Sequence, residues 1–376
     1  MTTVAEVVGA IDRAAPFRLQ LETDNSGLLV GDPKAKVRRV LVALDPTAGN
    51  VREAARAKAQ CLVTHHPLFF STTGPRQALP QRGGFTAETV AGAVALQAAA
   101  AGVALVAAHT NYDLAAGGLN DILAAMMGLK EATPMAPAAL ARGYKLVTFL
   151  PEEDLDRVEE ALFAAGAGRI GDYSECAFRA EGVGSFNGGM TTHPTLGERG
   201  RKEYVEEVRL ETVVPAGRVE AVVAALREAH SYEEPAFDLI PVDVPAAGAG
   251  LGRVGDLEKA MTVGALVARA KRAFGVKAVE VIGEKRGKVR RLAVGSGSAG
   301  DWWPHAARAG AEVYLTGEMK HADRLAARDA GLAVIVAGHF ATEQPAVAGL
   351  AGILRAALPG VSVVESRTEK DPSGWR

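Results

Sequence analysis

The alternation of apolar runs with amphipathic segments constrains this chain more than any other feature of its sequence. Buried strands are predicted over 37–45 and 103–107 and for the run ending at His65, with helices over 50–60 and 86–100 between them. Strands that alternate with helices in this order form a layered α/β domain. The same alternation resumes with a helix over 262–273 and continues to a helix over 345–357. The sequence therefore predicts a layered α/β core.

The middle of the chain has a different rhythm. Its expected elements are strand 145–150, helix 152–165, strands around 174–180 and 205–213, helix 217–229 and strand 236–242. This β-α-β-β-α-β order is that of a ferredoxin-like unit. A glycine-rich loop is expected over 184–203, and stretches rich in Pro, Ala and Gly at 133–137 and 245–250 are typical of linkers. We expect a discontinuous core, 1–132 and 246–370, interrupted by an inserted ferredoxin-like domain over 140–244.

Three apolar runs of the expected core end in histidine or carboxylate residues. These residues are His65 and His66, His109 and Asp113, and His339 and Glu343. Functional crevices of open α/β sheets lie beyond the carboxyl ends of the strands, so the three clusters are expected to converge on one pocket. A polar loop over 71–84 follows the His pair and is predicted to be a flexible loop or lid.

Histidine and carboxylate ligands without cysteine favour divalent ions such as Zn, Mn, Fe, Co or Mg. The five candidate metal ligands are His65, His66, Asp113, His339 and Glu343. Five ligands exceed the set that one tetrahedral structural zinc uses, whereas two ions bridged by a carboxylate or a water fit them. His109 is the candidate to relay a proton or to orient its neighbours. A lone His109 or His339 is also typical of a hydrogen-bonded core residue.

The spacing of His339 and Glu343 would place both on one face of a helix. Pro345 favours a first helical turn, so we expect a junction between loop and helix here, with Thr342 as the cap.

Three further groups of residues have two interpretations each. Gly295–Gly300 is typical of either a phosphate-binding loop or a plain turn. Glu318 and His321 either line the pocket or cap the next helix. Five residues of the insert either form a small ligand site or have surface and hinge roles: His193, His230, Tyr232, Glu233 and Glu234.

Composition excludes several classes of protein. A formal charge of -2 and a pI near 6.5 argue against a nucleic-acid partner, and 48% hydrophobic residues argue against a disordered chain. Cys61 and Cys176 lie far apart, which suits a reducing compartment, and the first residues lack the pattern of a signal peptide. The apolar stretch 91–108 is interpreted as a helix followed by a strand, not as a membrane span. We expect a cytoplasmic protein without a membrane segment.

Four motifs resemble the Nif-three-like dinuclear metal-centre family, whose members are often named GTP cyclohydrolase I type 2 homologs. The motifs are Asp24-Asn25-x-Gly27-Leu28, Thr64-His65-His66-Pro67-Leu68, His109-Thr110-Asn111-Tyr112-Asp113 and Gly338-His339-x-x-Thr342-Glu343. The insert carries Gly166-Ala167-Gly168-x-Ile170-Gly171-x-Tyr173 and Tyr232-Glu233-Glu234-Pro235-Ala236-Phe237-Asp238, which resemble the PII-like insertion of longer bacterial members. Thr23 is a departure, because members commonly carry Trp there.

The resemblance implies two divalent metal ions per chain, Zn, Mn, Fe or Co, bound by the residues matching His65, His66, Asp113, His339 and Glu343. It also implies a cytoplasmic, toroidal homohexamer whose cavity faces the metal sites. Neither cysteine is placed for the zinc that is associated with authentic GTP cyclohydrolase I chemistry.

Two hypotheses about function follow. The first is a metal-dependent hydrolase acting on a nucleotide or another phosphoester as its small-molecule substrate. The second is a non-catalytic metal carrier or a regulatory scaffold whose PII-like module senses a small ligand.

Overall fold

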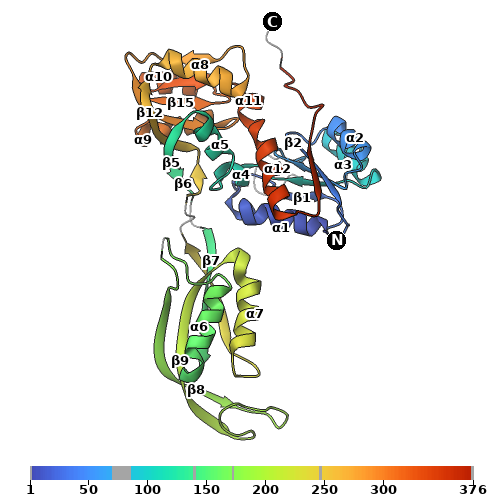
Figure 1. Ribbon diagram of the computed structural model, residues 1–376, viewed down its shortest axis with the longest axis vertical. Helices are drawn as coiled ribbons and strands as arrows, with labels where there is room; N and C mark the ends of the chain where they lie inside the picture. The colour runs from blue at the N-terminus through green and yellow to red at the C-terminus, as the bar shows by residue number, and fades with distance from the viewer. Residues whose placement is uncertain (1, 70–85, 139–140, 172, 245–247, 374–376) are drawn as a thin grey trace. The chain divides into compact units, whose positions relative to one another are not determined.

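The computed structural model describes residues 2–69, 86–138, 141–171, 173–244 and 248–373. The chain divides into two compact units, which we call the core unit (Met1–Ala139 with Gly248–Arg376) and the insertion unit (Leu140–Ala247). Figure 1 shows the helices and strands of both. The predicted lid over 71–84 and the first residues of the predicted linker over 245–250 lie outside the described residues.

The first sheet of the core unit has five strands in the order β1-β4-β3-β2-β17. Their bounds are β1 Gly27–Val30, β2 Arg39–Ala43, β3 Cys61–Thr64, β4 Ala104–Ala107 and β17 Ser362–Glu365. The strands from β17 to β4 are parallel, and β1 is an antiparallel edge strand. Its helices are α1 Val4–Ala14, α2 Ala48–Arg56, α3 Val90–Ala100 and α12 Pro345–Ala357. Every residue of β3 and β4 is buried, which explains why continuous apolar runs predict them well.

The second sheet of the core unit has six strands in the order β13-β16-β15-β14-β12-β5. Their bounds are β5 Leu129–Thr133, β12 Arg253–Met261, β13 Glu280–Ile282, β14 Val289–Gly295, β15 Val313–Thr316 and β16 Ala333–Val336. Helices α5 Leu119–Met126, α8 Val263–Phe274, α9 Trp303–Arg308 and α10 His321–Asp329 accompany it. Sequence patterns do not predict β5 or β12, because exposed and charged residues interrupt both strands. The linker expected from 133 therefore begins on the last residue of a paired strand.

The insertion unit folds in the order β7, α6, β8, β9, α7, β10. The bounds are β7 Ala141–Leu150, α6 Leu155–Ala164, β8 Ala177–Asn187, β9 Lys202–Pro215, α7 Val219–Ala229 and β10 Phe237–Val244. The strands form one antiparallel sheet in the order β10-β7-β9-β8, as in ferredoxin-like units. Both helices pack on one face of this sheet, with Val158 and Leu226 against Leu146 and Leu210 (Figure 1).

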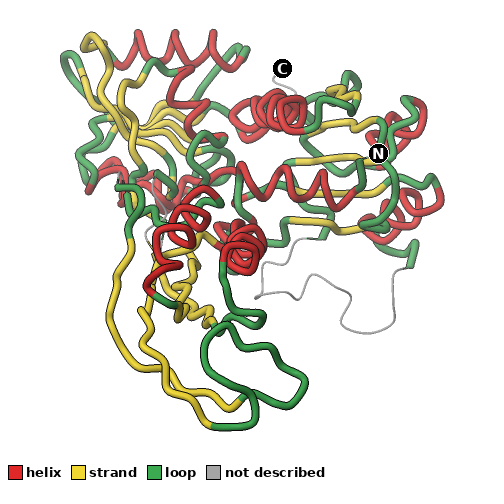
Figure 2. Tube along the Cα trace, turned by 60° about the horizontal axis from the view of Figure 1, so that its bottom comes forward, coloured by secondary structure: helices red, strands yellow, loops and turns green. Residues whose placement is uncertain are grey.

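The loop expected over 184–203 is present but shorter, over 188–201, because β8 continues to Asn187 and β9 begins at Lys202. β8 contains two glycines near this end and β9 begins with charged residues, so the apolar pattern that indicates a strand is missing there. Figure 2 shows the two long strands and the loop that joins them.

The chain leaves and re-enters the core unit at neighbouring points. Two short strands, β6 Ala136–Pro137 and β11 Gly250–Leu251, pair antiparallel, with Pro137 opposite Gly250. The pairing of β6 with β11 therefore holds together the two parts of the core unit between which the insertion unit lies in sequence.

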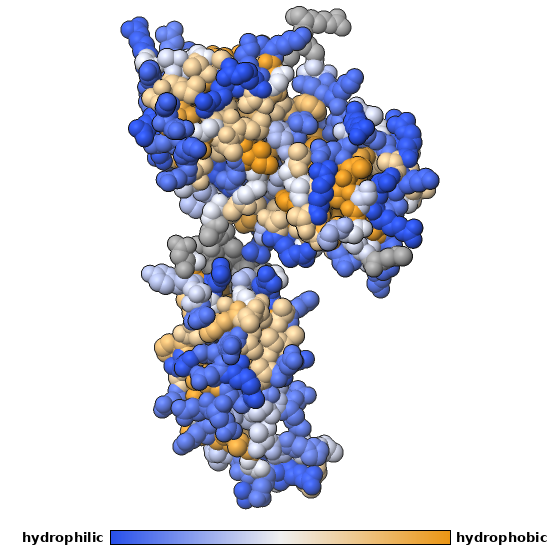
Figure 3. Space-filling model, viewed as in Figure 1, coloured by the Kyte–Doolittle hydropathy of each residue, from blue (hydrophilic) through white to orange (hydrophobic). Residues whose placement is uncertain are grey.

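The predicted α/β fold class is confirmed. Within the described ranges, no helix is both long and apolar enough to cross a membrane, and the stretch 91–108 is α3 followed by β4. Figure 3 shows hydrophilic residues spread over the visible surface, with apolar residues in smaller groups between them.

Candidate metal centre

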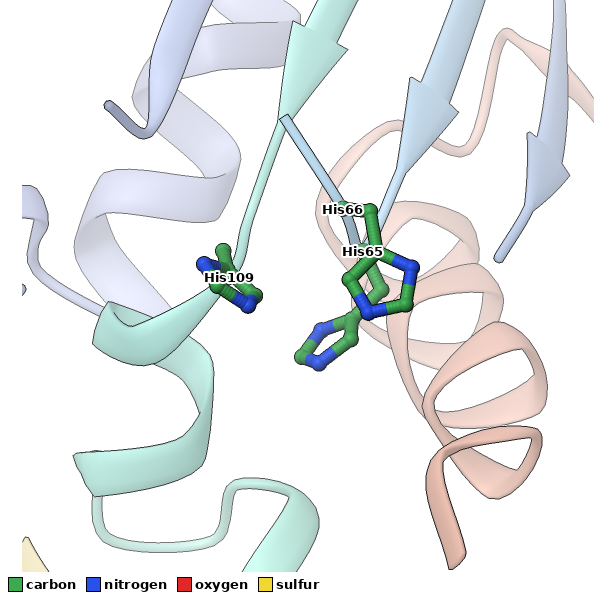
Figure 4. Close-up of side chains that lie close together, drawn as sticks. All are labelled: His65, His66 and His109. Carbon is green, nitrogen blue, oxygen red and sulfur yellow. The ribbon is translucent and has the colours of Figure 1, made fainter. Parts of the chain in front are cut away.

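Three histidines come from the ends of two neighbouring strands. β3 and β4 are parallel, with Thr64 opposite Ala107, so His65 and His66 leave the sheet at the same edge as His109. The Thr64 hydroxyl donates to the backbone oxygen of His66 (2.7 Å), which closes the turn after β3. Ring centroids lie 5.3 Å apart for His65 and His66, 5.2 Å for His65 and His109, and 5.4 Å for His66 and His109. Figure 4 shows the three rings gathered around a common space.

The other sheet of the core unit supplies His339 and Glu343. Both lie on α11 (His339–Glu343), which follows β16, and His339 Nε2 is 2.8 Å from Glu343 Oε2. His66 Nε2 lies 2.8 Å from the same oxygen. Instead of the expected junction between loop and helix, both residues lie on the short helix α11, which directly precedes α12. Thr342 does not cap the next helix, since Gln344 occupies that position and the Thr342 hydroxyl donates back to Gly338 O (2.9 Å).

His65 has the features of a neutral metal ligand. Its side chain is fully buried, and Nδ1 lies 2.9 Å from the backbone oxygen of Ala108, which places the ring proton on Nδ1. Burial lowers the pKa of His65 to about 3. The Nε2 lone pair has no hydrogen-bond partner among the described residues, and its nearest carboxylate oxygens are Asp113 Oδ1 at 3.8 Å and Glu343 Oε1 at 3.9 Å. A buried polar atom without a partner is costly unless a ligand satisfies it.

His66 and His339 carry positive charge beside Glu343. Burial opposes the charge on His66, but its contacts with Asp45 and Glu343 outweigh burial and raise its pKa to about 10. The contact with Glu343 raises the pKa of His339 to about 9. Burial favours the neutral form of Glu343, yet the contacts with His339 and His66 hold its pKa well below the usual range. The cluster therefore stabilises Glu343 as a carboxylate.

Two further carboxylates complete the cluster. Burial raises the pKa of Asp113 to about 7, and the Ser296 hydroxyl donates to its Oδ1 (2.8 Å). Asp24 Oδ1 lies 2.9 Å from His109 Nδ1, and Thr110 donates to Asp24 Oδ2 from both its backbone N–H and its hydroxyl. Burial would raise the pKa of Asp24, but the hydrogen bonds from His109 and Thr110 hold it far below its usual range.

The loop after β14 holds the ligands in place. Gly297 adopts a left-handed backbone (φ +54°), and a Cβ there would lie 2.7 Å from Cδ of Glu343. Its N–H donates to the Thr342 hydroxyl (3.1 Å). The sequence interpretations of Gly295–Gly300 are a phosphate-binding loop or a plain turn. Neither predicts that this loop contacts Glu343 through Gly297 and Asp113 through Ser296.

Sequence reasoning missed four residues that support the ligands. Asp45 Oδ1 lies 2.7 Å from His66 Nδ1, and Asp24 holds His109. Asp45 ends a predicted strand and Asp24 belongs to a recognised motif, so both had a signal in the sequence. Ser296 lies in the segment Gly295–Gly300, but nothing in the sequence indicates its contact with Asp113, and Glu369 had no signal, because the partners of both are distant in the chain. The Glu369 carboxylate accepts from the backbone N–H groups of the residue after β2 and of Asp45 (2.7 and 2.8 Å).

The structure brings together all five predicted metal ligands, and His109 joins them. Donor atoms within 4.8 Å of one another form two overlapping groups, His65 with His66 and His109, and His66 with His339 and Glu343. Imidazole and carboxylate donors around an unpaired buried nitrogen fit a divalent ion.

The other candidate residues lie in different settings. Glu318 Oε2 lies 3.2 Å from His339 Nδ1, whereas His321 is exposed at the first residue of α10. In the insertion unit, His230 is buried, with Nε2 3.0 Å from Phe149 O. Tyr232 donates to Glu207 (2.9 Å), and Glu233 accepts from the backbone N–H of His193 (3.0 Å). Glu234 lines a cavity of that unit.

A cavity of about 1080 Å³ opens beside the cluster in the core unit. Its lining includes His66, His339, Asp45, Lys320 and Arg324. This volume exceeds that of most small-molecule sites, roughly 300 to 1000 Å³, so there is room for a small molecule next to the histidines.

Comparisons with known proteins match nearly the whole chain. The family model DUF34/NIF3, described as NGG1p interacting factor 3, matches residues 2–372. A protein of Halalkalibacterium halodurans named "GTP cyclohydrolase 1 type 2 homolog" is 36% identical over 334 residues, 89% of this chain and 87% of the relative. A Bacillus subtilis protein of the same name is 34% identical over 370 residues, 98% of this chain and 97% of the relative. The crystal structure of a Bacillus cereus protein related to NIF3 superposes with a TM-score of 0.83 at 34% identity, covering 100% of this chain and 99% of that chain.

Proposed function

Because the chain belongs to the DUF34/NIF3 family, we propose that its cluster binds two divalent metal ions and that the protein is a metal-dependent hydrolase. The name "GTP cyclohydrolase 1 type 2 homolog", which the relatives carry, makes a nucleotide or another phosphoester the substrate class to test first.

The position of Glu343 carries this proposal. Its Oε2 lies 2.8 Å from Nε2 of both His66 and His339, whereas its Oε1 faces His65 Nε2 at 3.9 Å. A carboxylate that offers one oxygen to each of two donor sets is suited to bridge two ions. In our proposal His65 and Asp113 hold one ion, His66 and His339 hold the other, and Glu343 is shared. Zn, Mn, Fe and Co all suit these donors.

Two such ions would lower the pKa of a water and clamp substrate oxygens. Within the chain, His109 accepts a proton in our proposal, and Asp24 holds its ring through Nδ1 and stabilises the imidazolium that results. Ala108 O and Asp45 orient His65 and His66 in the same way. The cavity beside His66 and His339 then receives the substrate.

The test is hydrolysis of a nucleotide panel, including GTP, by protein loaded in turn with Zn, Mn, Fe and Co. His66→Ala and Asp113→Ala proteins are the controls, and bound metal is counted in each. We expect turnover that needs added metal and is lost in both variants. Turnover that continues without metal, or in Asp113→Ala, would refute the hydrolase.

A non-catalytic metal carrier or regulatory scaffold is the second candidate. It is favoured by the insertion unit, a separate folded module with its own cavity. No turnover across the panel, with two ions still bound per chain, would support this candidate instead.

Assembly and location remain proposals. We propose a homo-oligomer, with the toroidal hexamer as the expected form, and light scattering on purified protein tests its mass. Cytoplasmic location stays a prediction, which fractionation of cells would check.

A further inference from the structure

The insertion unit contains a cavity of about 570 Å³ that the metal chemistry does not use. It lies beside the sheet face opposite α6 and α7. Leu150 and Val208 are paired and pack in the helix-covered core, so the alternating neighbours Phe149 and Arg209, which are also paired, point to the other face. Phe149 and Arg209 line the cavity, together with Ala180 opposite Arg209.

Aromatic side chains and bare backbone shape this cavity. Phe149, Phe186 and Tyr232 line it, and Gly182 and Gly184 of β8 leave room where side chains would stand. The loop after β8 is tied to the opposite wall, because the Thr195 hydroxyl donates to Ser231 O (2.8 Å) and the N–H of His193 donates to Glu233 (3.0 Å). The cavity is therefore built from both regular strands and a fastened loop.

One carboxylate is held in position at this cavity. The Tyr232 hydroxyl donates to Glu207 Oε1 (2.9 Å), and burial together with this bond raises the pKa of Tyr232, so the hydroxyl stays a donor. A Cβ at Gly184 would lie 2.7 Å from Cδ of Glu207, so a side chain there would displace this carboxylate.

The charges of the lining residues favour a cation. Three carboxylates line the cavity, those of Glu207, Glu233 and Glu234, against the single guanidinium of Arg209, whereas Glu181 lies opposite Val208 and points to the other face of the sheet. Arg209 lies 2.8 Å from Glu211, which also pairs with Lys145 (2.7 Å), and its guanidinium carbon lies 5.6 Å from the centre of the Phe149 ring. Aromatic faces also attract cations, and an anionic ligand would meet more carboxylates than cationic side chains in the lining.

We propose that this cavity binds a small organic cation with an apolar, aromatic body and an ammonium group directed at Glu207. A volume of 570 Å³ is within the range of small-molecule sites, roughly 300 to 1000 Å³. All the lining residues belong to the insertion unit, so the site does not depend on the metal centre or on catalysis.

A matched pair of probes tests the charge preference. Tryptamine and indole-3-propionate share an indole ring and differ in the sign of their charge, and saturation-transfer NMR on the full chain follows both. We expect tryptamine to bind and indole-3-propionate not to bind. Absence of tryptamine binding, or equal binding of the two probes, would overturn the proposal. A tryptamine signal per chain that falls as protein concentration rises would also overturn it, since a second copy would then cover the cavity.

Two variants and one control locate the binding site. Glu207→Gln keeps the shape but removes the charge, and we expect about fivefold weaker tryptamine binding, the scale of one partly exposed ion pair. Gly184→Ala keeps the charge but displaces the carboxylate, with a similar loss. Glu206→Gln makes the same charge change on the opposite face of β9 and should leave binding unchanged. Circular dichroism confirms that each variant is folded. Unchanged binding in folded Glu207→Gln protein, or an equal loss in Glu206→Gln, would refute the assignment.

Discussion

Replacing Gly297 by Ala should damage the metal centre although no proposed ligand is itself substituted. The new Cβ would lie 2.7 Å from Cδ of Glu343 and 3.3 Å from His339 Nε2. Glu343 is buried and has little space to move away. The left-handed backbone (φ +54°) adds a penalty for any L-residue, about 1 to 2 kcal/mol. Overpacking of a filled interior costs a further amount, about 1 to 3 kcal/mol.

A second glycine separates these two costs. Gly275, at the end of α8, has a similar left-handed backbone (φ +67°), but a Cβ there meets nothing within 4 Å. Gly275→Ala therefore carries the backbone penalty alone. We expect Gly297→Ala to be the less stable of the two, by about 1 to 3 kcal/mol.

Chemical denaturation followed by tryptophan fluorescence measures this difference. All three tryptophans of the sequence, at 302, 303 and 375, lie outside the insertion unit, so the signal follows the core unit. Metal affinity should fall only in Gly297→Ala, about tenfold or more, because Glu343 is displaced. Equal stability of the two variants, together with unchanged metal affinity, would refute the close contact between this loop and Glu343.

Three further predictions concern the same centre and its surroundings. Glu369→Gln should lower metal affinity about tenfold, because it loosens the loop that follows β2. Glu365→Gln, which removes the charge from a surface ion pair with Arg355, should leave metal affinity unchanged. Competition with a chelator measures the metal affinity of both variants. His66 and His339, with pKa values raised to about 10 and 9, must each lose a proton to bind an ion, so Co²⁺ affinity should rise between about pH 6 and 9, and a flat titration profile would contradict this. Joining Pro137 to Gly250 through a short linker should yield a folded core unit with unchanged metal content by mass spectrometry, and an aggregated product would count against the independence of the core unit.

The sequence alone determined the α/β class and the candidate ligands, because both depend on local patterns. Fully buried strands such as β3 and β4 need continuous apolar runs, and the polar residues after them stand out. The strands β5 and β12 escaped prediction, since their stability comes from pairing within the sheet and not from an apolar period of their own.

Only the tertiary structure decided how the ligands are held. Ser296 is far from Asp113 in the chain, and Glu369 is far from the end of β2, yet each makes hydrogen bonds there. Gly297 is needed because of a carboxylate that approaches it from another element, not because of its neighbours in sequence. Such contacts form only when folding brings distant residues together, so hydropathy patterns and residue spacing do not predict them. The sequence therefore predicts the ligands, whereas supports such as Glu369 and the contact of Gly297 with Glu343 are visible only in the folded structure.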